Sequence, residues 1–302
     1  KTLGSDLPEL LGGSADLTGS NCTKVAGAEM VQKGALGDYI YYGVREFGMT
    51  AISNGLQLHG GYRPFTGTFL IFMEYARNAV RLAALMKAPN IFVYTHDSVA
   101  VGEDGPTHQP VEQITNLRTT PNLNTWRPCD TVESAIAWQS AIASRETPSA
   151  LIFTRQKTVA QARDKDTFNN VKRGGYILRD TDGQPDAIVI ATGSEVELAV
   201  AAAESLASAN VQVRVVSMPC VEVFSEQSAQ YKESVLPNNV RARVAVEAGH
   251  PDIWHRFVGL DGVVVGISSF GMSAPGAQAL AELGITTENV VQQVQSVIAA
   301  AS

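Results

Sequence analysis

Short apolar runs rich in β-branched residues alternate along the chain with segments of helical periodicity. In the first half, the runs predict strands at residues 39–42, 91–95, 123–126 and 150–154. Apolar residues three and four positions apart predict helices at residues 46–58, 69–87, 111–119 and 132–144, with residues 64–68 leading into the second of these. This alternation is typical of an α/β protein with a largely parallel sheet.

The same alternation resumes in the second half, after a polar stretch. The predicted strands are 187–191, 212–216, 244–247 and 263–266, and the predicted helices are 195–208, 253–258 and 274–283. Residues 156–175, between the halves, are rich in charged residues and asparagine, as linkers often are. We therefore predict two three-layer α/β domains with largely parallel sheets, at residues 1–160 and 161–302.

Composition and charge narrow the classes of partner. The chain has 23 basic and 30 acidic residues and a net charge of −7, without a long run of either sign. That balance argues against nucleic acid or an anionic membrane as the main partner. Three cysteines, Cys22, Cys129 and Cys220, form no CxxC pair and predict neither a disulfide framework nor a zinc site. Unpaired cysteines of this kind fit a reducing cytoplasm, where we expect the protein. No apolar stretch is long enough to span a bilayer.

The densest polar segment follows the predicted strand 91–95. Residues 96–98 and 102–110 together contain two histidines and three carboxylates around a Gly-Pro turn. Loops at the carboxyl ends of parallel strands are where α/β proteins bind ligands, and such side chains suit a polyhydroxylated substrate. A solvated turn is an equally good interpretation from composition. A metal loop is a further alternative, although the spacing matches no standard zinc or calcium pattern.

Three other signals are weak when taken singly. Glu46 lies between a predicted strand and an apolar helix, where acids often serve only as helix caps or dipole partners. Phe69, Phe72 and Tyr75 have helical spacing, which indicates core packing as readily as a cofactor platform. Arg155 follows a predicted strand and could bind a phosphate through two hydrogen bonds, or form a surface salt bridge.

The order of these segments is more specific than any one of them. Residues 12–17, 42–49, 96–110 and 154–156 resemble, in order and spacing, the pyrimidine-binding domain of transketolases. Segments 191–196 and 246–249 are similar to the C-terminal domain of the same family. The resemblance covers essentially the whole chain and implies a thiamine-diphosphate-binding fold followed by a transketolase C-terminal-like domain.

The resemblance implies a set of cofactor-binding residues. Glu46 matches the glutamate that hydrogen-bonds N1′ of the aminopyrimidine and so helps activate thiamine diphosphate. Phe69, Phe72 and Tyr75 match the aromatic pocket for that ring, with Phe72 the most favoured of the three. Asp16 matches a residue near the thiazolium side of the cofactor.

A second set would bind the substrate. Ser20, His96 and Arg155 match the residues that grip the phosphate of a sugar phosphate. Asp104 matches the residue that reads a substrate hydroxyl. His108 matches a residue close to the reacting carbons and is, with Glu46, the candidate for catalysis.

The family resemblance also implies an enzyme activity, but this sequence lacks one of the segments that the activity requires. Transketolases transfer a two-carbon ketol unit from a ketose phosphate to an aldose phosphate, as homodimers with thiamine diphosphate and Mg²⁺ or Ca²⁺. The family's Gly-Asp-Gly segment, which holds the metal and diphosphate in a preceding N-terminal domain, is absent here. We therefore expect no metal-binding residues and little or no activity from this chain alone.

The family's pyrimidine-binding domain also begins before the residue that matches Lys1, so we hypothesise a fragment of a longer enzyme rather than a natural split subunit. Two alternatives to a transketolase stay open. Dihydroxyacetone synthases share the motifs and use formaldehyde as acceptor, and a non-catalytic binding or assembly module could retain the fold.

Overall fold

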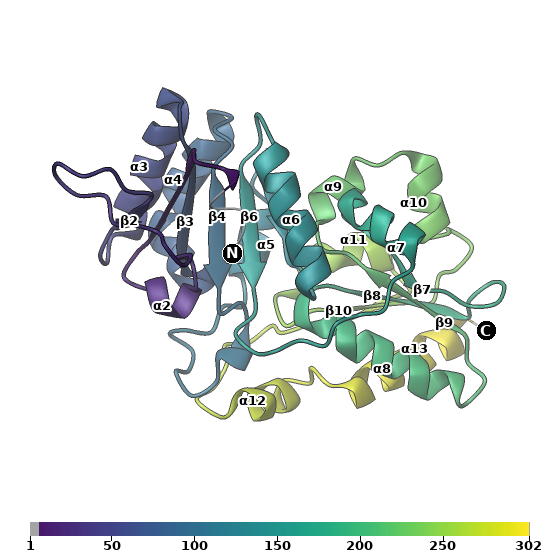
Figure 1. The fold of residues 1–302 in the computed structure, drawn as a ribbon. Coiled ribbons are helices and arrows are strands. Elements are labelled where there is room, and N and C mark those ends of the chain that lie inside the picture. The colour runs from purple at the N-terminus through teal and green to yellow at the C-terminus, as the bar shows by residue number, and fades with distance from the viewer. Residues whose placement is uncertain (1–5, 302) are drawn as a thin grey trace.

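The computed structural model describes residues 6–301, which form two α/β units side by side (Figure 1). The first unit contains a six-stranded sheet in the order β2-β1-β3-β4-β6-β5, and every pairing in it is parallel. Its strands are β1 (Leu10–Ser14), β2 (Tyr39–Tyr41), β3 (Arg63–Phe69), β4 (Ile91–Thr95), β5 (Asn124–Trp126) and β6 (Ser149–Phe153).

Helices cover both faces of the first sheet. They are α2 (Thr18–Asn21), α3 (Glu46–His59), α4 (Met73–Leu85), α5 (Gln113–Arg118) and α6 (Thr131–Ala143), with 3₁₀ turns η1 (Leu70–Phe72) and η2 (Val99–Val101). Phe92 and Tyr94 of β4 pack with α4 and α5 on one face. Ile91 and Val93 pack with α6 on the other, because successive side chains of a strand point to opposite faces. The unit therefore has three layers.

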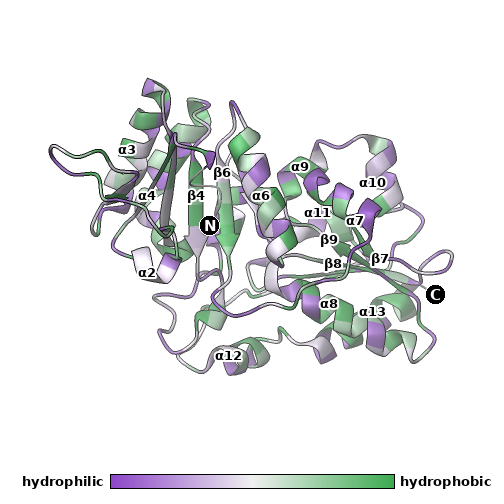
Figure 2. Cartoon of the chain, in the orientation of Figure 1, coloured by the Kyte–Doolittle hydropathy of each residue, from purple (hydrophilic) through white to green (hydrophobic). Residues whose placement is uncertain are grey.

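The second unit contains a five-stranded sheet in the order β11-β10-β8-β9-β7. Its strands are β7 (Tyr176–Arg179), β8 (Ala187–Ala191), β9 (Val213–Ser217), β10 (Arg243–Val246) and β11 (Val263–Val265). Only β7 among these strands runs antiparallel to its neighbour, β9. Figure 2 shows mainly hydrophobic residues in strands such as β6 and β8, as expected for strands covered on both faces.

Two groups of helices cover the second sheet. The helices of this half are α7 (Lys165–Asn170), α8 (Val196–Ala207), α9 (Val221–Ser225), α10 (Ala229–Val235), α11 (His255–Val258), α12 (Gly276–Glu282) and α13 (Thr287–Ala301), with 3₁₀ turns η3 (Val171–Arg173), η4 (Gly193–Glu195) and η5 (Pro251–Trp254). Helices α8 and α13 lie below the sheet in Figure 1, and α9, α10 and α11 lie above it. No helix within residues 6–301 has the length and apolar character needed to cross a membrane.

The predicted fold class is confirmed, and several elements differ in detail. Residues 10–14 and 63–69, for which the apolar pattern predicts no strand, form β1 and β3, two adjacent interior strands of the first sheet. The helix predicted from residue 69 begins instead at Met73, because residues up to Phe69 continue β3 and η1 follows. The polar stretch 156–175 contains α7 and η3. The pattern also predicts neither the antiparallel edge strand β7 nor the helices α9, α10 and α13.

The two units share buried contacts. Helix α6 lies between the first sheet and the second unit (Figure 1), and its residue Ile136 belongs to the same buried cluster as the core of the second unit. In return, Cys220 of the second unit is fully buried in a cluster of the first. This shared packing brings the carboxyl-end loops of both sheets into contact.

Candidate active site

The predicted site residues lie just beyond the carboxyl ends of five parallel strands. Asp16 follows β1, Glu46 follows β2, Phe69 ends β3, His96 follows β4 and Arg155 follows β6. Parallel strands end at the same edge of a sheet, so these side chains come from one edge. The strand order reverses at β1, which has β2 on one side and β3 on the other, and such a reversal is where α/β sheets bind ligands.

One cavity at this edge, which we call the Glu46 cavity, has a volume of about 800 Å³. Asp16, Glu46, Phe72 and Tyr75 all line it, so four of the predicted cofactor residues come together there. Glu46 is the first residue of α3 and is only 8 % exposed. Within residues 6–301 its carboxylate has no hydrogen bond or ion pair, which leaves its oxygens available to a ligand.

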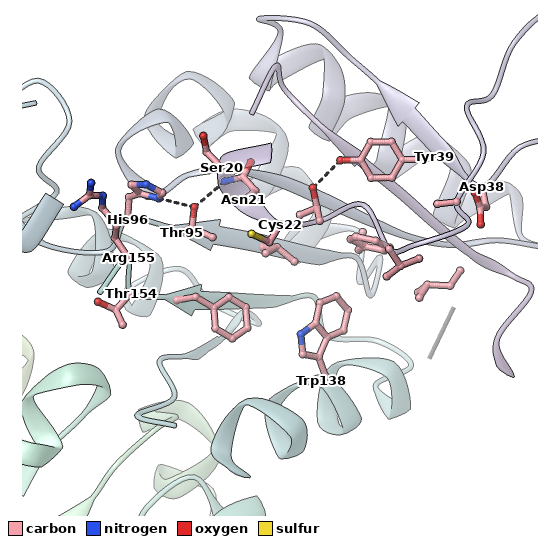
Figure 3. A pocket seen from close by; sticks show the side chains of 17 residues that line it. Ser20, Asn21, Cys22, Asp38, Tyr39, Thr95, His96, Trp138, Thr154 and Arg155 are labelled. Atoms are coloured by element: carbon pink, nitrogen blue, oxygen red, sulfur yellow. Dashed lines mark hydrogen bonds between the residues drawn. The ribbon is translucent and has the colours of Figure 1, made fainter. Parts of the chain in front are cut away.

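A second cavity of about 620 Å³, the His96 cavity, contains the predicted phosphate-binding residues. Figure 3 shows Ser20, His96 and Arg155 together at one end of it. The cavity then extends between apolar side chains that include Phe65 and Trp138. A hydroxyl, an imidazole and a guanidinium at one end of the cavity are suited to a phosphate group.

A row of aromatic rings joins the two cavities. The centroid of the Phe69 ring lies 3.7 Å from that of His96 and 5.7 Å from that of Phe72, and both pairs are stacked. Tyr75 continues the row, 6.2 Å from Phe72. Phe69 itself is buried and lines neither cavity, so its contribution is to hold His96 and Phe72 in place.

A chain of hydrogen bonds holds the His96 ring. The Asn21 Nδ2 group donates to Thr95 Oγ1 at 2.7 Å, and Thr95 Oγ1 lies 2.9 Å from His96 Nδ1 (Figure 3). The Ser14 hydroxyl donates to Asn21 Oδ1 at 2.9 Å. Asn21 is absent from the residues predicted above, because a single asparagine in a short helix carries no sequence signal.

Backbone conformation and charge both set His96 apart. His96 and Asp16 have φ angles of 61° and 64°, in the left-handed region that costs an L-residue about 1–2 kcal/mol. Strained residues of this kind concentrate at functional sites. Burial and the positive charge of Arg155 lower the pKa of His96, while Asp97 and Asp104 oppose the shift. The imidazole is therefore held neutral at neutral pH.

The loop at residues 102–109 carries the last two predicted residues. His108 packs edge-on against Phe72, with ring centroids 5.4 Å apart. Asp104 is exposed and lines neither cavity, although its charge acts on His96. The Gln109 amide donates to the carbonyls of Gly102 and Met272, each at 2.8 Å, so the second unit braces this loop.

Among residues 6–301, no group of three or more histidines, cysteines or carboxylates is arranged to hold a metal ion.

Models of known protein families match both units of this chain. The family model for the transketolase pyrimidine-binding domain matches residues 1–160, which is more than half of the chain. The chain belongs to the transketolase family. The model for the transketolase-like C-terminal domain matches residues 174–286.

Transketolase relatives match nearly all of this chain, and the match covers less than half of each relative. Transketolase 1 of Escherichia coli K12 is 56 % identical over 298 residues, which are 99 % of this chain and 45 % of the relative. The transketolase from Leishmania mexicana superposes with a TM-score of 0.94 at 44 % identity, over 99 % of this chain and 44 % of its own.

A transketolase from Pichia stipitis, described as a complex with sedoheptulose-7-phosphate, superposes with a TM-score of 0.93 at 40 % identity, over 99 % and 44 % of the two chains. The chain thus spans somewhat under half the length of these transketolases and corresponds to their C-terminal portion.

Proposed function

We propose that this chain supplies the cofactor-activating and sugar-phosphate-binding side of a transketolase reaction. In that reaction a two-carbon ketol unit passes from a ketose phosphate to an aldose phosphate with thiamine diphosphate as cofactor. The observation that carries the proposal is the buried Glu46 carboxylate, free of protein partners among the described residues and facing a cavity walled by Phe72 and Tyr75. The aromatic row connects that cavity to Ser20, His96 and Arg155.

The Glu46 cavity fits the aminopyrimidine ring of thiamine diphosphate. The ring needs flat apolar walls, which Phe72 and Tyr75 provide, and one of its nitrogens needs a hydrogen-bonding partner, which Glu46 provides. When bound, the cofactor supplies the nucleophilic carbon that accepts the ketol unit. Glu46 would hold a proton at the N1′ atom of the bound ring, and Asp16, which lines the same cavity, would face the thiazolium.

The His96 cavity fits the phosphate of the sugar. Thr95 Oγ1 accepts the Asn21 amide hydrogen and can donate its own proton to His96 Nδ1. The neutral imidazole then carries its single N–H proton on Nε2 and donates this hydrogen bond to a phosphate oxygen. Ser20 adds a hydroxyl, and Arg155 adds the positive charge and the paired donors that a dianion favours.

Two residues act between the cavities. Asp104 binds a hydroxyl of the sugar, consistent with its exposed position on the loop beside His96. His108 packs against Phe72 and, in this proposal, is the imidazole that moves a proton at the reacting carbons.

A second protein surface completes the site in this proposal. Val44 and Phe47, which line the Glu46 cavity, are 73 % and 52 % exposed, and Tyr75 is 69 % exposed. Apolar side chains exposed around a cavity mark an interface. We infer that a second subunit of a homodimer covers this edge and brings the diphosphate site with its Mg²⁺ or Ca²⁺. The 302-residue chain alone should then show little or no activity.

A chimera tests the proposal. In it, this chain replaces the matching part of E. coli Transketolase 1, and ketol transfer is measured with thiamine diphosphate and Mg²⁺. We expect Glu46→Ala to lower turnover by about 10²–10⁴-fold, the range for loss of a proton-transfer group. Glu74→Ala is the matched control, because Glu74 accepts hydrogen bonds from Gln113 and Asn116 and lines neither cavity.

Three outcomes would count against the proposal. Near-normal turnover by Glu46→Ala, with circular dichroism showing the fold intact, would remove Glu46 from activation. Activity with formaldehyde as the preferred acceptor would indicate a dihydroxyacetone synthase. A verified dimer without turnover would indicate a non-catalytic module.

A further inference from the structure

Arg127, from the first unit, fills the ligand position of the second sheet. The strand order of that sheet reverses at β8, between β9 and β10, which is where an α/β unit binds its ligand. Arg127 directly follows β5, and its side chain is fully buried at this point. Its Nη1 group donates to the Thr192 carbonyl at 2.9 Å and pairs with Glu195, and Glu247 lies 3.5 Å away.

The second unit is shaped around this arginine. Gly193 has a φ of +57°, and a Cβ atom there would lie 2.6 Å from Arg127 Cζ, so a larger residue would collide with the guanidinium. Gly193 N and Thr192 Oγ1 donate to the Arg127 carbonyl at 3.0 and 3.1 Å. The Arg127 N–H donates to the Pro219 carbonyl at 2.7 Å. The second unit thus binds both the backbone and the side chain of Arg127.

The opposite side of the guanidinium reaches the candidate active site. Arg127 Nε donates to Asp97 Oδ2 at 2.9 Å, and Asp97 is 1 % exposed. Asp97 directly follows His96, whose left-handed backbone needs support from its surroundings. Ser98, the next residue, accepts a hydrogen bond from Ala100 N and caps η2. Anchoring Asp97 therefore fixes the turn that carries the His96 imidazole.

Other residues of the second unit also contact the segment that follows His96. Ser273 Oγ donates to the Glu103 carbonyl, and Gly276 packs so closely on Ala100 that a Cβ atom there would lie 2.4 Å from the Ala100 carbonyl oxygen. The second unit therefore supports the segment after His96 at two separate places.

We propose that Arg127 is a positioning residue, through which the packed second unit holds the His96 turn in the conformation that binds the substrate phosphate. The proposal rests on the proposed function, because it takes His96 as a phosphate ligand. It also gives the second unit a specific task in the reaction, namely setting the affinity for phosphorylated sugars.

The kinetic test uses Arg127→Lys in the chimera described above. Lysine keeps the positive charge, but it lacks the planar fork that reaches Asp97, Glu195 and the Thr192 carbonyl at once. We expect the KM for sedoheptulose 7-phosphate to rise about tenfold, as when one charge-assisted hydrogen bond weakens. The KM for unphosphorylated sedoheptulose, with glycolaldehyde as acceptor in both assays, should not change.

Arg163→Lys is the matched control. The Arg163 side chain is also almost fully buried and pairs with two carboxylates, Asp130 at 2.6 Å and Glu133 at 3.5 Å, but it makes no contact with residues 96–98 in the described part of the chain. We expect this variant to lose stability without discriminating between the phosphorylated and unphosphorylated sugar. Asp97→Asn perturbs the same link from its other end with less risk to folding, and it should act in the same direction as Arg127→Lys.

A second readout does not depend on turnover. The His96 imidazole signals of the 302-residue chain are recorded by NMR and assigned by their loss in His96→Gln, with inorganic phosphate as the probe. We expect Arg127→Lys and Asp97→Asn to shift these signals and weaken phosphate binding, and Arg163→Lys to leave both unchanged.

Unshifted His96 signals in both test variants, or equal losses for the two sugars, would overturn the positioning role. If the unsubstituted chimera transfers no ketol unit, the proposed function fails, and the NMR comparison still decides whether Arg127 positions His96.

Discussion

A buried ion pair between the two units offers the sharpest test of how they are held together. Arg118 ends α5 and forms two hydrogen bonds with Glu247, from Nη1 at 2.6 Å and from Nη2 at 3.0 Å. The side chains are 0 % and 1 % exposed. Trp254 Nε1 also donates to Glu247 at 2.7 Å, and its ring lies 5.1 Å from the Arg118 guanidinium carbon. Arg118→Met removes two of the three hydrogen bonds to a carboxylate that stays buried.

The expected cost follows from that geometry. Removing one partner of a buried ion pair costs about 3–5 kcal/mol when the other charge is left unpaired. Arg127, 3.5 Å from Glu247, still offsets part of that charge, so we expect a cost near the lower end, about 3 kcal/mol. The double variant Arg118→Met/Glu247→Gln removes that charge, so its residual cost should fall to about 1 kcal/mol, close to that of an ordinary hydrogen bond. Urea unfolding, followed by tryptophan fluorescence and circular dichroism, measures both values. A single variant that costs less than the double variant would refute the reasoning.

The pH dependence provides a second check on the same pair. Burial by itself raises the pKa of Glu247, but Arg118 and Arg127 outweigh it and hold the pKa below the usual 4.5. A carboxyl whose pKa is lower in the folded state stabilises the protein above its unfolded pKa, and this contribution is lost as the pH falls through the folded value. In Arg118→Met much of the lowering is gone, so its stability should decrease less on acidification than that of the unsubstituted chain.

Two further predictions concern the candidate active site. Phe72→Ala should weaken thiamine diphosphate binding to the chimera about fivefold by calorimetry, since one stacked ring contributes about 1 kcal/mol beyond its buried area; unchanged affinity would remove Phe72 from the ring wall. Arg155→Ala should raise the pKa of His96 and Asp104→Asn should lower it further, because burial sets the shift and these two charges act on it in opposite directions. NMR titration measures both pKa changes, and movement in the same direction would contradict the charge arrangement.

Apolar patterning predicts some strands closely and misses others for a physical reason. Strands β4 and β8 begin and end at the predicted residues, because their sequences, IFVYT and AIVIA, are apolar runs rich in β-branched or aromatic residues. Strand β3 has the sequence RPFTGTF, with Thr66 and Thr68 almost completely buried. Strand β1 contains Gly12 and Gly13, where a Cβ atom would lie 2.4 Å from Phe65 and 2.3 Å from Tyr42. Interior strands that need small or hydroxyl side chains for close packing therefore lose the apolar signal.

Some residues of the candidate site could be predicted from the sequence, and others could not. The convergence of His96 and Arg155 follows from strand-end geometry together with the order of the family motifs. Asn21 and Arg127 could not be predicted in the same way, because their partners are remote in sequence: Thr95 is 74 residues from Asn21, and Glu195 is 68 from Arg127. An isolated arginine in a sequence is most simply interpreted as a surface charge, and only the tertiary structure shows it buried between three carboxylates.

The position of Arg127 at the carboxyl-end edge of the second sheet has a consequence for protein engineering. A shortened enzyme ending near residue 160 would leave Arg118 without Glu247 and Arg127 with Asp97 as its one remaining carboxylate partner among those described, on a face no longer shielded from water. Exchanging the C-terminal unit between family members would succeed only if the incoming unit brings a glycine equivalent to Gly193 and acids equivalent to Glu195 and Glu247. The two units are therefore poor candidates for modular recombination, although each has its own sheet and its own core.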